Sequence, residues 1–404
     1  MARVLMMTMT APSHINARVA LAQHLLGLGH HVGWLCTRRP DPRLAQLGVE
    51  VFELPDPPAM SRITGEARMR MVGDEHAELG QLRKMFLGPF LDQIESVRGV
   101  LRTFRPDVVA LDGNLYHHVV ATQLEQIPWA TVSSGLWLVQ PRSLDYPMRR
   151  MASQLEEERR AFFDRHGMRP EVRLFECVSP ALNVVATTTE LVGEPADWPT
   201  HTIAAGPMLP TKPRGDEVEL AWERLRTDCP IVYLAMGTGF YWNPEIVRAA
   251  ASACAELGAQ LVASVMDLAA HDAVRGLPGD PLIVQYVPQL EMLARVTAFV
   301  THGGASSVRE ALNFGVPQIV VPMSLDQPVQ AYFVEHAGAG VALERTAFTA
   351  ESCRDALAPM LDPRSQVRRR ATAIGNSYRA IDGCAVVAER LLAMIGSKPE
   401  DLRA

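Results

Sequence analysis

The sequence alternates short, uninterrupted apolar runs with segments whose apolar residues recur at helical spacing. The run RVLMMTM at 3–9 is followed by a helical pattern, for which Asn16 is the expected N-cap, and then by a second apolar run at 31–37. The same order returns at 106–134. Strands that are apolar on both faces are typical of a parallel sheet covered by helices on both sides. The first half of the chain is therefore predicted to be a doubly wound α/β domain.

A segment rich in proline, glycine and charged residues follows at 204–219 and marks the expected domain linker. Beyond it the alternation starts again, with apolar runs at 230–239, 260–265, 282–289, 298–304 and 318–323. A chain of 404 residues is long enough for two domains with separate cores. The predicted fold class is thus α/β, with two Rossmann-like doubly wound parallel-sheet domains that face each other across a binding cleft.

Composition narrows the class of protein. The chain is 48% hydrophobic and 21% charged with a net charge of −6, which fits a soluble globular protein and argues against non-specific binding to nucleic acid. Its six cysteines lie far apart without a Cys-x-x-Cys pair, so neither a disulfide framework nor a zinc knuckle is indicated. No apolar stretch approaches the roughly 18 residues of a membrane-spanning helix. We expect a cytoplasmic protein, monomeric or homodimeric, with no nucleic-acid partner and no stable membrane insertion.

A histidine, glycines and serines stand where a predicted strand of the second domain ends and a helix begins. His302 and Gly304 lie at the carboxyl end of the strand, where ligands of open α/β sheets bind. A glycine there lets a ligand approach the backbone, and the helix start favours an anion such as phosphate. Ser306 and Ser307 add hydroxyl donors, and Glu310, on the same helix face as Ser306, can accept hydrogen bonds from sugar hydroxyls.

The next predicted strand is followed by Asp326 and Gln327, which should emerge into the same crevice. Taken singly, His302 could be an ordinary strand-end histidine and Asp326 a helix N-cap. The complete order of residue types, from His302 through Glu310 to the acid–amide pair, favours a ligand site over these alternatives.

Together these motifs resemble those of the nucleotide-sugar-dependent glycosyltransferases of the GT-B type. The nearest resemblance is to the UDP-glycosyltransferase family, with its bacterial macrolide, carotenoid and other natural-product glycosyltransferases. It covers nearly the whole chain and is strongest over 285–340. It implies that the diphosphate is contacted by His302, Gly304, Ser306 and Ser307, the ribose by Glu310, and hydroxyls of the donor sugar by Asp326 and Gln327.

The resemblance also implies a division of the chain. An acceptor-binding domain that carries the catalytic base is expected over 1–205 and a linker over 206–218. A nucleotide-sugar-binding domain is expected over 219–375, and a C-terminal helix that packs back on the N-terminal domain over 376–404.

The segment QYVPQ resembles the family's Trp-x-Pro-Gln motif near the base and ribose, which implicates Tyr286, Val287 and Gln289. Tyr286 replaces the tryptophan of plant members, so stacking on the pyrimidine is retained but the choice between uridine and thymidine stays open. Thr238 matches a hydroxyl close to the phosphates. Without the resemblance it would be taken for an ordinary strand-to-loop threonine.

In the first domain, APSHINA resembles the family's Gly-His-x-x-Pro segment and places His14 in the position of the catalytic base, although Ser13 and Ala17 replace the usual glycine and proline. An imidazole can take a proton from a hydroxyl at neutral pH and needs a carboxylate to orient it. Asp112, at the end of an apolar run, matches that acid; its alternative is a helix N-cap. Two neighbouring histidines, His117 and His118, are interpreted as packing or acceptor-side residues.

The implied reaction is a direct displacement with inversion. The sequence contains no Asp-x-Asp, the metal-binding pair of the other major glycosyltransferase fold, so neither a metal nor another cofactor is expected. An apolar acceptor, such as a natural product, is indicated by Met60, Met85 and Trp137, although these residues suit a core equally well. The charged run at 151–176 is expected to form helices with solvated faces and is assigned no chemistry.

Glucose is the expected donor sugar, because Asp326 and Gln327 suit a fully hydroxylated ring. Three alternatives stay open. The first is an antibiotic glycosyltransferase that uses a TDP-deoxysugar. The second is a non-catalytic sugar-nucleotide-binding activator, which the presence of both His14 and Asp112 disfavours. The third is a nucleotide-sugar epimerase of the same architecture, which is disfavoured by these two residues together with Glu310 and the acid–amide pair.

Overall fold

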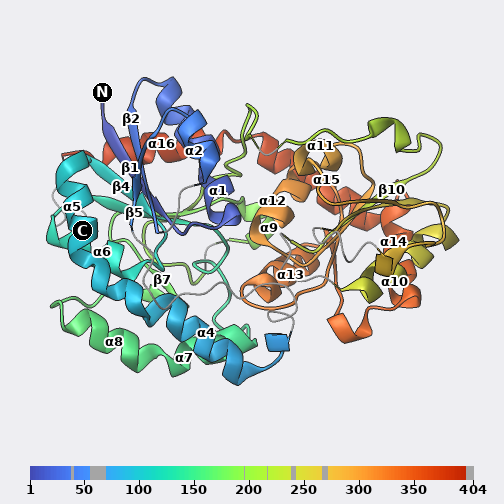
Figure 1. The fold of residues 1–404 in the computed structure, drawn as a ribbon, viewed down its shortest axis with the longest axis horizontal. Helices are drawn as coiled ribbons and strands as arrows, with labels where there is room; N and C mark the ends of the chain where they lie inside the picture. Colours follow the sequence, from blue (N-terminus) through green and yellow to red (C-terminus); the bar gives the residue numbers. More distant parts are fainter. Residues whose placement is uncertain are drawn as a thin grey trace.

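The computed structural model describes residues 1–37, 41–54, 70–194, 196–215, 217–237, 243–265 and 272–396. The chain forms two lobes side by side, with the first half in one lobe and most of the second half in the other (Figure 1). No helix in the described ranges is long and apolar enough to cross a membrane.

The first lobe is built on a seven-stranded parallel sheet in the order β3-β2-β1-β4-β5-β8-β9. Its strands are β1 (Arg3–Thr8), β2 (His31–Cys36), β3 (Glu50–Glu53), β4 (Val108–Leu111), β5 (Trp129–Ser133), β8 (Asn183–Val185) and β9 (Thr202–Ala204). Its helices include α1 (Pro12–Gly27), α2 (Pro42–Gln46), α4 (Glu75–Leu87), α5 (Ile94–Phe104), α6 (Tyr116–Leu124), α7 (Pro147–Gln154), α8 (Glu156–Asp164) and α9 (Thr189–Val192). A two-stranded hairpin, β6 (Val172–Arg173) and β7 (Glu176–Cys177), lies beside it.

The second lobe contains a six-stranded parallel sheet in the order β12-β11-β10-β13-β14-β15. Its strands are β10 (Ile231–Ala235), β11 (Gln260–Ser264), β12 (Leu282–Val284), β13 (Ala298–Thr301), β14 (Gln318–Val320) and β15 (Gly340–Ala342). Its helices include α10 (Pro244–Glu256), α11 (Gln289–Leu293), α12 (Ala305–Asn313), α13 (Gln327–His336), α14 (Ala350–Leu361) and α15 (Gln366–Arg379). The predicted fold class is confirmed.

The continuous apolar runs form strands that are buried on both faces. Val4 and Met6 belong to one core cluster, whereas Leu5 and Met7 belong to another on the opposite face of the first sheet. All four are fully buried. This arrangement explains why the run at 3–9 does not alternate with polar residues, since β1 is covered on both faces of the sheet.

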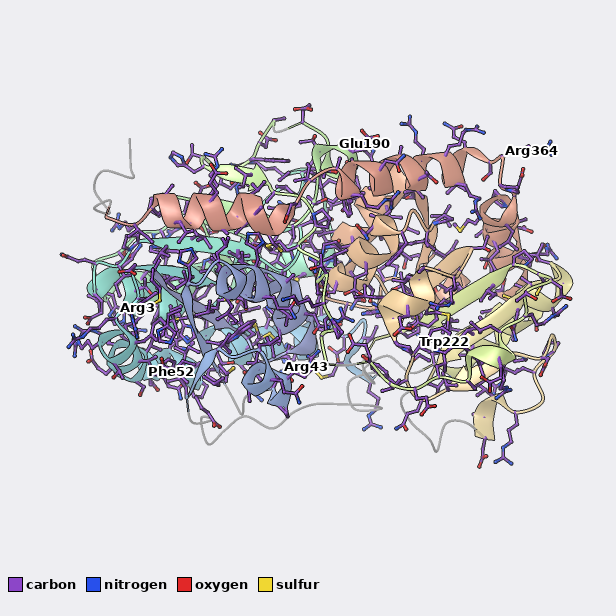
Figure 2. All side chains as sticks on the ribbon, turned by 90° about the horizontal axis from the view of Figure 1, so that it is seen from above. Arg3, Arg43, Phe52, Glu190, Trp222 and Arg364 are labelled. Carbon is purple, nitrogen blue, oxygen red and sulfur yellow. The ribbon has the colours of Figure 1, made fainter. Side chains whose placement is uncertain are left out.

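The last helix, α16 (Gly383–Ala393), returns to the first lobe (Figure 2). Its Val387, Ala388 and Leu391 are buried in the same cluster as Val4 and Met6. Gly383 lies so close to Gly206 that a Cβ on Gly383 would be 2.8 Å from the Gly206 carbonyl oxygen, so glycine is required at this crossing. The domain boundaries stay predictions, but the C-terminal segment contributes to the first lobe's core.

Candidate active site

Helix α1 begins at Pro12, with Ala11 as its N-cap residue, so the expectation that Asn16 caps the helix is wrong. The earlier start places His14 in the first turn, next to the carboxyl end of β1. The neighbouring strand β4 pairs with β1 in parallel, with Met7 opposite Leu111, so Asp112 emerges at the same edge of the sheet. The imidazole Nδ1 of His14 lies 2.9 Å from Asp112 Oδ2.

Asp112 is fully buried and its carboxylate is hydrogen-bonded on both oxygens. Oδ2 accepts a hydrogen bond from the Met9 amide at 2.8 Å as well as from His14, and Oδ1 accepts one from Arg18. Burial opposes ionisation, but the positive Arg18, together with His14 and the Met9 amide, outweighs it and lowers the pKa of Asp112 to about 2. Asp112 therefore carries its charge at neutral pH. The N-cap alternative is wrong, because α6 has Leu115 as its N-cap residue.

Arg18 is a member of this network that sequence reasoning missed. Its side chain is fully buried, and it donates hydrogen bonds to Asp112 Oδ1, to the Val132 carbonyl and to the His14 carbonyl at 3.1 Å. An arginine four residues after His14 shares a helix face with it, so the spacing alone could have drawn attention to it. Arg18 joins α1 to the ends of β4 and β5.

Ser134 also contacts His14, with its Oγ 3.2 Å from His14 Nδ1. Both Ser134 and Asp112 contact Nδ1. A proton on Nδ1, directed at Asp112, leaves Nε2 as the basic nitrogen. The side chain of His14 is 16% exposed, so the ring is partly accessible.

In the second lobe, His302 follows β13 and its ring lies against two glycines. A Cβ on Gly237 would be 3.1 Å from the ring, and a Cβ on Gly304 would be 2.7 Å from Nε2. Burial lowers the pKa of His302 to about 4, so the ring is neutral at neutral pH. A neutral imidazole can still donate one hydrogen bond to an anion.

The N-terminus of α12 contacts the first lobe directly. Ser306 Oγ donates a hydrogen bond of 3.2 Å to the carbonyl of Ser13, the residue before His14. The two predicted half-sites, almost 300 residues apart in the sequence, are therefore in contact. The neighbouring residue, Ser307, makes its contact within the second lobe: its Oγ accepts a hydrogen bond from Gln289 Nε2 at 3.3 Å.

Glu310 is almost fully buried, with 1% of its side chain exposed, and both of its oxygens have partners. Oε2 accepts a hydrogen bond from Gln289 Nε2 at 2.6 Å, and Oε1 accepts one from Arg214 Nη1 at 2.7 Å. The structure thus brings Gln289 and Glu310 together, with Val287 buried and Tyr286 half-buried beside Gln289 in the sequence. Arg214 comes from the expected linker, and no local motif indicates its role.

Asp326 and Gln327 stand at the start of α13, and Asp326 approaches the first lobe, where a Cβ on Gly135 would be 3.3 Å from Asp326 Oδ2. Asp326 is the N-cap residue of α13, as its alternative expects, but its side chain makes no capping hydrogen bond. Burial raises the pKa of Asp326. Gln327 Oε1 accepts hydrogen bonds from the amides of Met323 and Ser324, at 2.7 and 3.1 Å, which leaves the NH2 group as the part of this side chain that can donate to a sugar.

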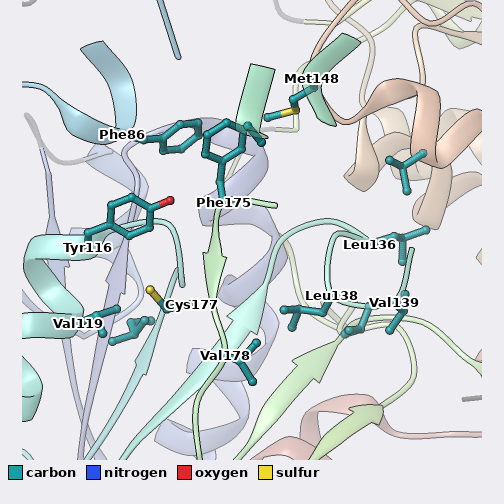
Figure 3. Close-up of a cluster of buried hydrophobic side chains, with 14 of the residues drawn as sticks. Phe86, Tyr116, Val119, Leu136, Leu138, Val139, Met148, Phe175, Cys177 and Val178 are labelled. Atoms are coloured by element: carbon teal, nitrogen blue, oxygen red, sulfur yellow. The ribbon is translucent and has the colours of Figure 1, made fainter. Parts of the chain in front are cut away.

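The predicted acceptor residues Met85 and Trp137 are partly buried and pack on an aromatic cluster. Phe86 and Phe175 stack with ring centroids 4.3 Å apart, and Figure 3 shows them beside Met148 and above Tyr116. Met60 and Thr238 lie outside the described residues.

His117 and His118 are fully within the protein, and their rings contact each other at 4.3 Å between centroids. Burial lowers the pKa of His117 to about 3 and that of His118 well below its usual value. Both rings are therefore neutral and pack in the lobe interior, and no contact connects them to His14.

The chain is similar to known proteins in its sequence and in its fold. Residues 249–394 match the family described as "Erythromycin biosynthesis protein CIII-like, C-terminal domain". The chain is 25% identical to the NDP-glycosyltransferase YjiC of Bacillus subtilis (strain 168) over 87% of each chain. It is 24% identical to 4'-demethylrebeccamycin synthase of Lentzea aerocolonigenes, which spans 94% of this chain and 96% of that protein.

A solved structure of similar fold is that of CalG4, the calicheamicin glycosyltransferase. It superposes with a TM-score of 0.75 at 19% identity and covers 98% of both chains. The family match, the full-length relatives and the shared fold agree with the resemblance found in the motifs. Together they identify the chain as a glycosyltransferase of the GT-B fold.

Proposed function

We propose that this protein is an inverting glycosyltransferase that moves a sugar from a nucleoside diphosphate to a hydroxyl of an apolar small molecule. The observation that carries the proposal is the contact between the two half-sites: the His14–Asp112 pair adjoins the N-terminus of α12 through the Ser306–Ser13 hydrogen bond. A base and an anion site in contact are what a transfer between two bound substrates requires.

The donor is proposed to bind with its diphosphate at the N-terminus of α12. Free backbone amides and the helix dipole favour an anion there, and His302 can add a hydrogen bond from a neutral ring. The ribose is assigned to Glu310 and Gln289, and the sugar hydroxyls to Asp326 and the amide of Gln327. Developing charge on the leaving diphosphate is stabilised by the backbone amides at the start of α12 and by His302, so the proposal includes no metal.

The reaction is a single displacement. His14 Nε2 takes the proton of the acceptor hydroxyl while the acceptor oxygen forms a bond to the anomeric carbon. The bond between that carbon and the diphosphate oxygen breaks, and its electron pair leaves with the nucleoside diphosphate. Attack from the face opposite the leaving group inverts the anomeric centre. Asp112, held ionised beside Arg18, orients His14 and stabilises the imidazolium that forms.

The acceptor is proposed to be a natural product. Trp137, three residues after Ser134, is only partly buried and packs on the buried rings of Phe86 and Phe175, and 4'-demethylrebeccamycin synthase and the calicheamicin enzyme are named for natural products. For the donor we favour UDP-glucose, because a deoxysugar would leave Asp326 or Gln327 without a hydroxyl partner. A TDP-deoxysugar is the second candidate, since Tyr286 does not select between the two bases.

The test offers UDP-glucose and TDP-sugars with a panel of aglycones and identifies products by mass spectrometry. His14→Ala is the key variant, with binding of UDP measured in parallel by calorimetry. We expect UDP to bind normally and transfer to be lost. A variant that binds UDP and still glycosylates at the wild-type rate would disprove the assignment of the base. A wild type that binds UDP but glycosylates nothing would favour the activator alternative.

A further inference from the structure

Glu176 is a buried carboxyl that has no place in the reaction described above. The charged run at 151–176 was expected to have solvated faces, and α7 and α8 account for much of it, but the run ends inside the protein. Glu176 lies in β7 of the small hairpin and is 1% exposed. Its Oε2 accepts a hydrogen bond of 2.7 Å from Ser133 Oγ, at the carboxyl end of β5.

The hydroxyl of Ser133 that contacts Glu176 also contacts the turn at 133–135. Ser133 Oγ accepts a hydrogen bond from the Gly135 amide at 3.3 Å. Two acceptors compete for its proton: Glu176 Oε2 at 2.7 Å and the Gly135 carbonyl oxygen at 3.1 Å. A serine hydroxyl has one proton, so a carboxyl oxygen at this point decides which way that proton is directed.

The turn carries two contacts to the reaction site. Ser134 Oγ lies 3.2 Å from His14 Nδ1. Gly135 faces Asp326, and even a methyl group there would be 3.3 Å from Oδ2. A small shift of the turn would therefore change both the environment of the base and the space around the sugar-binding acid.

We propose that Glu176 is a positioning residue for this reaction, which acts through Ser133 to hold the 133–135 turn against His14 and Asp326. The inference rests on the proposed function only in taking His14 as the base. Glu176 contacts neither substrate nor reacting atoms; its effect passes through the Ser133 hydroxyl.

The charge state of Glu176 supports this role. Burial and the negative Asp112 raise its pKa to about 7, against the opposing effects of Ser133, Arg18 and His14. The titratable groups that face it are His14 and Arg18 on α1, Asp112 after β4, Tyr116 on α6 and Cys177 on β7. A neutral carboxyl holds Ser133 without placing a second buried anion beside Asp112, and a glutamine can do the same.

The test compares Glu176→Gln with Glu176→Leu. The amide oxygen of Gln can accept the Ser133 hydrogen bond, so kcat should stay within about threefold of the wild type, whereas Leu should lower kcat by about tenfold or more with the KM for donor little changed. Ser133→Ala should cause a similar loss of kcat, and the double variant Ser133→Ala/Glu176→Leu should be no less active than either single variant.

The control is Glu171→Leu, at a carboxylate that is 51% exposed just outside the hairpin. A folded Glu176→Leu variant with wild-type kcat, or additive losses in the double variant, would overturn the proposal.

A second measurement needs no activity. The imidazole NMR resonances of His14 should shift in Glu176→Leu and Ser133→Ala but not in Glu176→Gln or Glu171→Leu. If they do so in a protein that transfers no sugar, the positioning role holds and the proposed function fails. Unchanged resonances in an active enzyme would overturn the positioning role alone.

A pH series checks the buried carboxyl itself. Because the folded pKa is raised from 4.5 to about 7, the folded wild type loses stability as pH rises through this interval, and Glu176→Gln does not. The melting temperature of Glu176→Gln relative to the wild type should therefore increase between pH 5 and 7.5 and then level off. A flat difference would show that Glu176 ionises in the folded protein at the same pH as in the unfolded chain and would contradict the raised pKa.

Discussion

Asp112 and Asp326 belong to different lobes and have different surroundings, and Asp112 is fully buried whereas Asp326 is partly buried. Asp112 accepts a hydrogen bond from Arg18 on one carboxylate oxygen, and from His14 and a backbone amide on the other. These contacts lower the pKa of Asp112 to about 2. No arginine or lysine pairs with Asp326 in the described part of the chain, and burial raises its pKa. The first is suited to orient a base that becomes positive, and the second to accept hydrogen bonds from neutral hydroxyls.

The contrast shows that burial alone does not decide the charge of a carboxyl. Both groups are removed from water, which raises a carboxyl pKa, and only the one with a cation in contact overcomes this effect. Four predictions test or refine the comparison between the two lobes.

Asp112→Asn is expected to have the largest effect. The amide fills the same space but leaves Arg18 without its counter-charge and no longer stabilises the imidazolium, so kcat should fall by roughly 1,000-fold. Asp326→Asn should lower kcat by only about tenfold, because it weakens hydrogen bonds to the sugar. Steady-state kinetics at saturating donor measure both. Equal losses would contradict the difference between the two aspartates.

Gly304→Ala should act on the donor side alone. The new methyl group would lie 2.7 Å from His302 Nε2 and push the ring away from the start of α12, so UDP should bind between about ten- and a hundredfold more weakly in calorimetry. Gly99→Ala, in the middle of α5 with nothing within 4 Å of the added methyl group, is the control and should leave UDP binding unchanged. Normal UDP affinity in Gly304→Ala would remove His302 from the diphosphate site.

Arg214→Met tests whether the second lobe, like the first, uses an arginine to orient a carboxylate and keep it ionised. Glu310 would lose its partner at 2.7 Å, and UDP should bind about tenfold more weakly with kcat at saturating donor little changed. Arg226→Met is the matched control, because Arg226 and its partner Asp228 are 44% and 70% exposed. A loss confined to kcat would place Arg214 with the catalytic groups instead of the nucleotide.

The smallest effects are expected in stability against pH, and they should have opposite signs. Asp112 stabilises the folded state above its unfolded pKa of 3.8, and this contribution, about 2 kcal/mol, is lost as pH falls toward 2. Asp326, with its raised pKa, lowers stability as pH rises above 3.8. Urea unfolding of the wild type against Asp112→Asn and Asp326→Asn between pH 3 and 6 measures both. If the contributions of Asp112 and Asp326 to the free energy of unfolding changed with pH in the same direction, the two carboxyls would share one kind of environment, and the comparison would fail.

Much of the fold follows from local pattern. The apolar runs at 3–9 and 298–304 predict strands because both faces of each sheet are covered, and parallel strand ends bring His14 and Asp112 together although 98 residues separate them. The residues proposed to bind the donor can also be picked out from the sequence, because strand end, glycine and helix start are adjacent in it.

Arg18 could have been found from its spacing to His14, whereas Arg214 and Glu176 come from places where the sequence carries no local signal. Arg214 stands in a segment whose composition predicts a linker, and Glu176 is the last residue of a charged run that predicts helices with solvated faces. Their partners, Glu310 and Ser133, lie 96 and 43 residues away. A charged side chain becomes part of a site only through what packs against it, so its role depends on tertiary contacts that periodicity and spacing do not encode.

The crossing at Gly206 and Gly383 has a mechanical consequence. The chain passes between the lobes twice, once after β9 and once before α16, and the two passages touch at these glycines. Two passages in contact at one place act as a pivot, so we expect that the lobes can rotate about this crossing but cannot separate there. We therefore expect that the rotation that opens the cleft to release the nucleotide also separates His14 from α12, so that the enzyme cannot activate an acceptor while its donor site stands open.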